Sequence, residues 1–367
     1  MGTHTKLSVT ALITLAVSAG PLLAGYQDAV GFSRLQSEVA DLPDGTGLTA
    51  SIIELEYNGV WALQYSGKNI TYPYKNSDGS SAHAKIVADH MVGSGSMAPN
   101  LRDIQSGYGF DWIYEGLNFL TSEMPDEGPD IINHSWVSNW YRNYSEQALR
   151  RMDYQIDRDE TLSFNAMENG TEGMDYLVAN SYNGIAVGQS SGNHNRGGTI
   201  IDGNDRLKPD LVSPANMPYT SYSTPVVAGA SAILIGESER NAELADARKS
   251  EVMKALLMAG ATKAEFSGWS NTESKPLDVI YGAGELNIYN SYKVLMAGQQ
   301  EADAGSVVSP SGWDLGVSPA SGNNLYLFEV PAGEAQPFSA VLTWHRKFGP
   351  SDQYGWMLFE AMPLADL

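Results

Sequence analysis

Short apolar runs alternate with helix-like segments over most of this 367-residue chain, from about residue 45 to residue 297. The apolar runs at 50–53, 130–133 and 185–187 have the length and composition of buried strands. The helix-like segments between and after them cover 85–92, 112–121, 225–236 and 249–259. Such alternation predicts an α/β fold, in which a parallel sheet carries helices on both faces.

A small hydroxyl residue stands at the start of one of these helix-like segments, within Pro218-Tyr-Thr-Ser-Tyr-Ser-Thr-Pro-Val-Val-Ala-Gly229. Pro225 suits the first turn of a helix, because that turn has no use for its N–H. Ser221 would then lie just before the helix, where free N–H groups and the helix dipole stabilise a developing anion. This arrangement fits a nucleophile, although a buried helix with a serine cap is the alternative explanation.

A serine nucleophile needs a base, and the segment from Ser81 to Asn100 offers one. This segment has the pattern of a helix that begins at His83 and ends in a glycine-rich turn. His90 lies two turns further along the same helix, and we interpret it as structural. The spacing Gly93-x-Gly95-x-x-Ala98 also matches a dinucleotide-binding fingerprint, but it follows a helix and not a strand, so we discard that interpretation. The remaining histidines have weaker claims; they are His4, His134, His194 and His345.

Four segments resemble conserved blocks of the subtilases, which are the subtilisin-like serine proteases. Along the chain, these segments follow the same order as the blocks of the family. Residues 218–229 resemble the serine block G-T-S-x-A-x-P-x-V-A-G, and residues 83–93 resemble the histidine block H-G/A-T-x-V-A-x-x-x-x-G. Residues 45–54 align with the strand G-x-G-V-x-V-A-V-I-D, and residues 162–170 resemble V-V-A-A-G-N-G. The resemblance covers about residues 45–300. It implies a subtilisin-like α/β fold and the hydrolysis of peptide bonds.

The resemblance also implies a role for four residues. Ser221 falls on the nucleophile and His83 on the base, while Glu54 stands where the family has the aspartate that orients the base. Asn169 falls on the side-chain donor to the oxyanion, and the Ser221 N–H would be the second donor. Glu56 is the fallback acid. We rank Asn193 and Asn195 below Asn169 as oxyanion donors.

The chain departs from the family pattern at three of these positions: Glu54 replaces the aspartate, Tyr219 replaces a glycine, and Glu168 replaces a small residue. A glutamate can also fix the tautomer of a histidine, and it does so in some α/β-hydrolases. A bulky Tyr219 side chain could occupy the approach to the serine or point to solvent. We therefore keep a second hypothesis, in which the chain is a catalytically inactive subtilase-fold protein that binds partners outside the cell.

Composition narrows the function classes. The net charge of -21 argues against nucleic acid as a partner, because phosphates would repel it. The absence of cysteine and of an H-E-x-x-H motif argues against catalytic zinc. We therefore expect a protein or peptide substrate and chemistry that requires no cofactor. Structural calcium fits the acidic excess, with Asp202-Gly-Asn-Asp205 as a weak candidate.

The ends of the chain differ from its middle. Residues 1–24 have a basic start, an apolar run and a small-residue end, which predicts a cleaved signal peptide and a secreted or periplasmic protein without a further membrane span. Residues 25–44 form an N-terminal segment that is too short for a folded pro-domain, and the resemblance implies a peptidase domain at residues 45–300. Residues 303–367 predict a short, β-sandwich-like C-terminal region that stops while still apolar, as a truncated domain would. Its expected strands are 324–330, 338–344 and 356–360.

Overall fold

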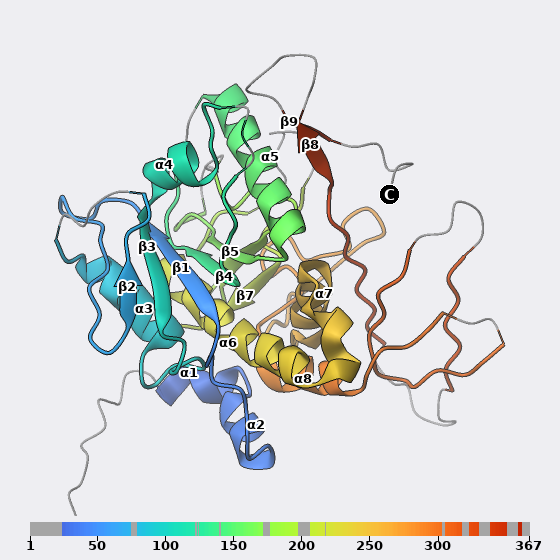
Figure 1. The fold of residues 1–367 in the computed structure, drawn as a ribbon. Coiled ribbons are helices and arrows are strands. Elements are labelled where there is room, and N and C mark those ends of the chain that lie inside the picture. The colour runs from blue at the N-terminus through green and yellow to red at the C-terminus, as the bar shows by residue number, and fades with distance from the viewer. Residues whose placement is uncertain are drawn as a thin grey trace, which may run out of the picture.

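A seven-stranded parallel sheet forms the centre of the computed structural model, in the order β2-β3-β1-β4-β5-β6-β7 (Figure 1). The structure describes residues 24–361 except 75–78, 122, 124, 139–140, 172–176, 197–205, 217, 303–304, 318–322, 330–337 and 351–358. The seven strands are β1 (Thr49–Glu54), β2 (Asn69–Thr71), β3 (Asp103–Tyr108), β4 (Ile131–His134), β5 (Leu162–Ala166), β6 (Ile185–Gln189) and β7 (Leu211–Ser213). The predicted α/β fold is confirmed.

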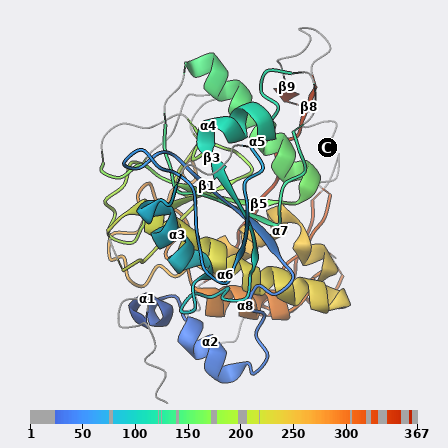
Figure 2. The same cartoon turned by 60° about the vertical axis from the view of Figure 1, so that its left-hand side comes forward.

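Helices cover both faces of this sheet (Figures 1 and 2). The apolar side chains of β1 show the division: Ile52 belongs to a core shared with α3 and α6, whereas Ile53 belongs to a second core shared with α5. Strands buried on both faces explain the short, continuous apolar runs in the sequence. The helices are α1 (Ala24–Ala29), α2 (Phe32–Glu38), α3 (Ala82–Val92), α4 (Gly109–Asp111), α5 (Arg142–Asp159), α6 (Thr220–Arg240), α7 (Ser250–Gly260) and α8 (Ile288–Met296), with a π-helical turn at Trp112–Gly116 and a 3-10 helix at Ala242–Arg248.

Helix α6 is the buried centre of one face, where it contacts α3 and strands β4 to β7. Its residues Val226 to Ile235 are buried throughout, so it has no polar face. A side chain at Gly229 could not be accommodated, because its Cβ would lie 2.9 Å from the carbonyl oxygen of Met91 in α3. Glycine therefore lets the two helices cross closely.

The start of α6 differs from the prediction. The helix begins at Thr220, so Ser221 lies in its first turn and Pro225 lies inside it, not at its start. A proline inside a helix removes the hydrogen bond from its own position to the carbonyl four residues earlier. That carbonyl belongs to Ser221, and the side-chain hydroxyl of Ser135 satisfies it instead, at 2.8 Å. The residue directly after β4 thus supplies the donor that the proline lacks.

The N-terminal segment packs onto the core. Helix α1 places Tyr26 and Val30 in the core shared with α6, and α2 adds Phe32 and Leu35. The proposed signal peptide lies outside the described residues, except for Ala24. Among the helices that the structure describes, none is both long enough and apolar enough to cross a bilayer.

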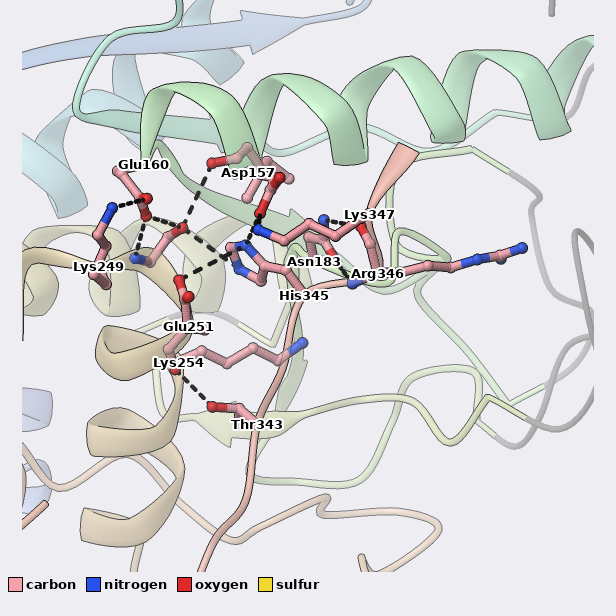
Figure 3. Close-up of polar contacts among 12 residues, drawn as sticks. Asp157, Glu160, Asn183, Lys249, Glu251, Lys254, Thr343, His345, Arg346 and Lys347 are labelled. Carbon is pink, nitrogen blue, oxygen red and sulfur yellow. Dashed lines mark hydrogen bonds and ion pairs between the residues drawn. The ribbon is translucent and has the colours of Figure 1, made fainter. Parts of the chain in front are cut away.

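The C-terminal region forms less sheet than expected in its described part. Strands β8 (Phe348–Pro350) and β9 (Phe359–Ala361) pair antiparallel, and Leu327 makes a single bridge with Val307. The strand expected at 338–344 does not form. The chain from Thr343 to Phe348 instead crosses between α5 and α7, where side-chain contacts hold it (Figure 3). We call residues 343–348 the C-terminal strap.

Candidate active site

Glu54 and His83 form a hydrogen-bonded pair at the carboxyl end of the sheet. Glu54 is the last residue of β1, and His83 lies in the first turn of α3, which the hydroxyl of Ser81 caps by accepting from the Ala84 N–H. His83 Nδ1 lies 2.9 Å from Glu54 Oε2. The Glu54 side chain is 3% exposed and that of His83 is 18% exposed. The carboxylate therefore holds Nδ1–H from within the core, and Nε2 is the ring nitrogen left for proton exchange.

Burial and the pair contact act in opposite directions on the charge of His83. Burial alone would lower the pKa of the imidazole, but the hydrogen bond and the charge of Glu54 outweigh it and raise the pKa. Burial raises the pKa of the Glu54 carboxyl, against the effect of His83. Glu56, the fallback acid, is exposed and is not the partner of His83. Glu54, and not Glu56, thus makes the contact with His83 Nδ1.

Ser221 lies at the N-terminus of α6, where backbone N–H groups have no partner within the helix. Thr220 N–H donates to Asn169 Oδ1 at 2.9 Å, and the N–H groups of Tyr222 and Ser223 both donate to the Tyr219 carbonyl. Within the described part of the chain, this leaves the Ser221 N–H as the unengaged donor of the first turn. The positive end of the helix dipole adds to it. The position suits an anion beside the Ser221 hydroxyl.

Two reciprocal hydrogen bonds join Ser221 to the end of β4. Ser135 Oγ donates to the Ser221 carbonyl at 2.8 Å, and Ser221 Oγ donates to the Ser135 carbonyl at 3.2 Å. Asn133 Nδ2 donates to Ser135 Oγ at 2.9 Å and completes the tether. Among the described contacts, Ser221 and His83 share no hydrogen bond, and the Ser221 hydroxyl is directed at the residue after β4. Nucleophile–base hydrogen bonds are commonly long before substrate binds.

Asn169 lies beside Ser221, three residues beyond the end of β5. Its Oδ1 accepts from the Thr220 N–H at 2.9 Å and from Thr220 Oγ1 at 3.2 Å. Because the amide is planar, these contacts direct Nδ2 away from Thr220, and the residue is exposed. The turn requires Gly170, whose φ is +88°. Asn169 can thus offer an N–H beside that of Ser221.

The two other departures from the family pattern have a local explanation. Tyr219 is the N-cap of α6 with φ −135°, an extended backbone that any residue can adopt, so no glycine is needed there. Its side chain is 45% exposed. Glu168 takes part in the Asn169 turn through its backbone, whose N–H donates to Asn195 Oδ1 at 3.1 Å and whose carbonyl accepts from the Asn195 N–H at 2.9 Å.

The structure also assigns the residues that ranked lower. Asn195 and Asn193 brace the Asn169 turn, because the Gly170 N–H donates to the Asn193 carbonyl at 3.4 Å. His134 is fully buried, and burial lowers its pKa to about 3, so it is a neutral core residue. Sequence reasoning missed the tether from Ser135. A signal for it was present, since a proline four residues after the serine leaves a carbonyl without its helical donor.

A second serine, histidine and acid arrangement occurs at the C-terminal strap (Figure 3). His345 Nδ1 lies 3.1 Å from Asp157 Oδ1, and its Nε2 lies 3.4 Å from Ser250 Oγ. Ser250 is buried, and Glu160 Oε2 accepts from both its N–H at 2.9 Å and its Oγ at 3.0 Å. A carboxylate therefore already occupies the N-terminus of α7. In the described part of the chain, Ser250 and the His345 side chain are each 2% exposed, so this arrangement is buried.

The described residues contain no candidate metal site. Within those residues, no group of three or more histidine, aspartate or glutamate side chains is arranged to hold a metal ion. The calcium candidate Asp202–Asp205 lies outside the described residues.

No family model matches the chain, and no curated protein sequence matches it. Solved structures with a similar arrangement include fervidolysin from Fervidobacterium pennivorans, a keratinolytic enzyme related to subtilisin, with a TM-score of 0.49 and 15% identity. That alignment covers 73% of this chain and 45% of fervidolysin, so it spans less than half of that enzyme. A lanthipeptide protease aligns with a TM-score of 0.46 and 19% identity over 75% of this chain and 93% of its own. The PatG macrocyclase in complex with peptide aligns with a TM-score of 0.47 and 15% identity over 74% of this chain and 98% of its own.

Proposed function

We propose that this protein is a serine endopeptidase that hydrolyses peptide bonds through an acyl-enzyme. Ser221 is the nucleophile, His83 the general base and Glu54 the acid that orients it. Asn169 Nδ2 and the Ser221 N–H stabilise the oxyanion. Two observations carry the proposal. His83 is paired with Glu54 at 2.9 Å, and its ring lies 5.7 Å from that of Tyr222, the neighbour of Ser221. The Ser221 N–H, at the start of α6, has no partner among the described residues.

The proposed reaction begins when the Ser221 hydroxyl turns from the Ser135 carbonyl toward His83. Ser221 Oγ attacks the peptide carbonyl while its proton passes to His83 Nε2. Glu54 stabilises the imidazolium through Nδ1–H. The carbon–nitrogen bond then breaks, and Nε2 returns the proton to the departing amine. Water, deprotonated by the same nitrogen, attacks the acyl-enzyme and releases the carboxylate product, and Ser221 recovers its proton.

The charges of the site suit this sequence of steps. His83 must be neutral to accept a proton and charged in the transition state, and the Glu54 carboxylate favours the charged form. The oxyanion forms where the dipole of α6 is positive. The reaction uses no cofactor, and its substrate is a protein or peptide. We further propose that the protein acts after export, once residues 1–24 have been removed.

A fluorophosphonate probe tests the proposal, because it labels an activated serine. The wild-type protein should be labelled and Ser221→Ala should not. Ser250→Ala is the matched control, since it removes the serine of the buried arrangement and should retain labelling. A folded wild-type protein that resists the probe and leaves unfolded protein substrates intact would contradict the proposal and favour the inactive binding protein.

A further inference from the structure

A stack of aromatic rings runs from the proposed base to the N-terminal helix. The ring of Tyr222 in α6 lies 5.7 Å from that of His83, measured between centroids, with an angle of 37° between planes. The same Tyr222 ring also stacks on His90, with 5.5 Å between centroids and 8° between planes. His90 in turn stacks on Tyr26 of α1 at 6.0 Å and 26°. One tyrosine thus contacts both histidines of α3.

The contact follows from helix periodicity. His83 and His90 are seven residues apart in α3, which is about two turns, so both side chains lie on one face. That face meets Tyr222 in the first turn of α6, and the two helices pack closely further along, at Met91 and Gly229. Tyr222 follows Ser221 in the chain, so its ring is fixed to the same turn as the nucleophile.

His90 is suited to act as a flat, uncharged support. Its Nδ1 lies 2.8 Å from the Ile86 carbonyl, which accepts the Nδ1–H, and burial lowers its pKa. Its Nε2 is buried without a hydrogen-bond partner among the described residues. An imidazole kept there at the cost of an unpaired nitrogen contributes mainly through its ring.

The imidazole of His83 needs a second constraint besides Glu54. The contact at Nδ1 fixes one atom of the ring, but the ring can still rotate about that contact and move Nε2. Two rings flank it: Tyr57 at 5.9 Å, which is 53% exposed, and Tyr222, which is 7% exposed. Tyr222 is further held by Tyr219, edge-on at 5.7 Å. The buried, supported ring is the more rigid of the two.

We propose that Tyr222 is a positioning residue that sets the plane of the His83 ring, with His90 as its support, so that Nε2 faces Ser221. The inference rests on the proposed function, because it concerns the same base. It gives a role to His90 that the sequence motifs did not indicate. It also explains why a large ring is tolerated directly after the nucleophile.

Paired substitutions separate the ring from the hydroxyl of Tyr222. Tyr222→Phe keeps the ring and should retain kcat within a few-fold. Tyr222→Leu removes the ring, and kcat should fall about 10²-fold with KM little changed, since a displacement of about 1 Å costs that much. Tyr292→Leu is the matched control, because Tyr292 is a similarly buried helical tyrosine, 4% exposed, whose hydroxyl contacts Glu237 in α6. It should lower the melting temperature and leave kcat unchanged.

His90 provides a second pair in case Tyr222→Leu does not fold. His90→Phe keeps a stacked ring and should retain most activity, whereas His90→Leu should lose about tenfold in kcat, a fraction of the loss for direct displacement. A loss confined to KM in Tyr222→Leu, or wild-type kcat in both leucine variants, would overturn the inference.

A proton NMR measurement reads the ring without turnover. The Nδ1–H of His83 should be protected from exchange by its contact with Glu54, and Tyr222→Leu should speed its exchange while Tyr222→Phe does not. Unchanged exchange in Tyr222→Leu argues against positioning even in an inactive protein. Failure of the proposed function is recognised separately, because then the wild-type protein itself resists the fluorophosphonate probe.

Discussion

Two regions of this molecule each bring a serine, a histidine and an acid together. The region in which hydrogen bonds connect all three side chains is not the proposed active site. At the C-terminal strap, His345 is hydrogen-bonded to Ser250 through one ring nitrogen and to Asp157 through the other. At the sheet, Glu54 and His83 are paired, but the Ser221 hydroxyl donates to Ser135 instead of His83. A search for triad distances alone would choose the strap.

The surroundings separate the two regions. Glu160 occupies the helix N-terminus beside Ser250, and the His345 side chain is 2% exposed. The N-terminus beside Ser221 keeps a backbone N–H and has Asn169 next to it, while the His83 side chain is 18% exposed. Access and a vacant place for negative charge therefore distinguish a reactive arrangement from a structural one.

The largest contrast is expected from neutralising the acid in each region. Glu54→Gln removes the charge that stabilises the His83 imidazolium and should lower kcat about 10⁴-fold, whereas Glu54→Asp should keep part of the activity. Asp157→Asn makes the equivalent change at His345 and should leave kcat unchanged. Steady-state peptidase assays on the three variants measure this. Equal losses from Glu54→Gln and Asp157→Asn would erase the distinction between the regions.

A smaller effect is expected from the oxyanion donor. Asn169→Asp keeps an oxygen to accept from Thr220 but replaces the Nδ2 donor, and kcat should fall at least about 10²- to 10³-fold. The melting temperature should stay close to that of the wild type, because the contact with Thr220 is retained. Turnover that survives this change would show that Asn169 is not a donor to the reacting carbonyl.

His345→Leu should affect stability and not turnover. It removes the two contacts of the imidazole, with Asp157 and Ser250, each of which contributes about 0.5–1.5 kcal/mol to the free energy of unfolding. Ser250 keeps its hydrogen bond to Glu160, and Asp157 keeps its contact with Lys347. Chemical denaturation measures the loss, and the fluorophosphonate reaction rate should remain that of the wild type. A slower reaction would connect the strap to the proposed active site.

The smallest effect is a shift in pH dependence. His83 can accept a proton only when neutral, and Glu54 raises its pKa above the usual 6.5, so kcat/KM should fall as the pH drops through a value above 6.5. In Glu54→Gln, burial still lowers the pKa of His83 but no carboxylate raises it, so this acid limb should move to lower pH. The residual activity of that variant, followed across pH, checks the sign. An acid limb that moved upward would exclude His83 as the group that titrates.

The sequence predicted the sheet and the positions of the paired residues well, because the local pattern decides them. The run Ile52-Ile53 before Glu54 specifies a buried strand that ends in an acid, and β1 ends there. The pattern after Ser81 specifies a capped helix, and α3 begins at Ala82. The roles assigned to Ser221, His83, Glu54 and Asn169 stay predictions.

Where the prediction failed, distant contacts decided the outcome. Helix α5 was missed because its sequence is highly charged and because its buried face includes polar residues such as Arg151, Asp153 and Gln155, which hide the apolar pattern. Residues 338–344 have strand-forming composition, but they do not form a strand, and Thr343 instead contacts α7. The helix-like pattern at 112–121 gave a π-helical turn that ends at Gly116.

Pro225 has a mechanical consequence. In an uninterrupted helix, the Ser221 carbonyl would accept a hydrogen bond from the next turn, and the Ser221 hydroxyl would move whenever the helix bends. Because Pro225 has no N–H, the Ser221 carbonyl accepts its hydrogen bond from Ser135, directly after β4. Ser221, the proposed nucleophile, is thus held to the end of the strand beside β1, which carries Glu54, so bending of α6 need not change the distance between Ser221 and Glu54.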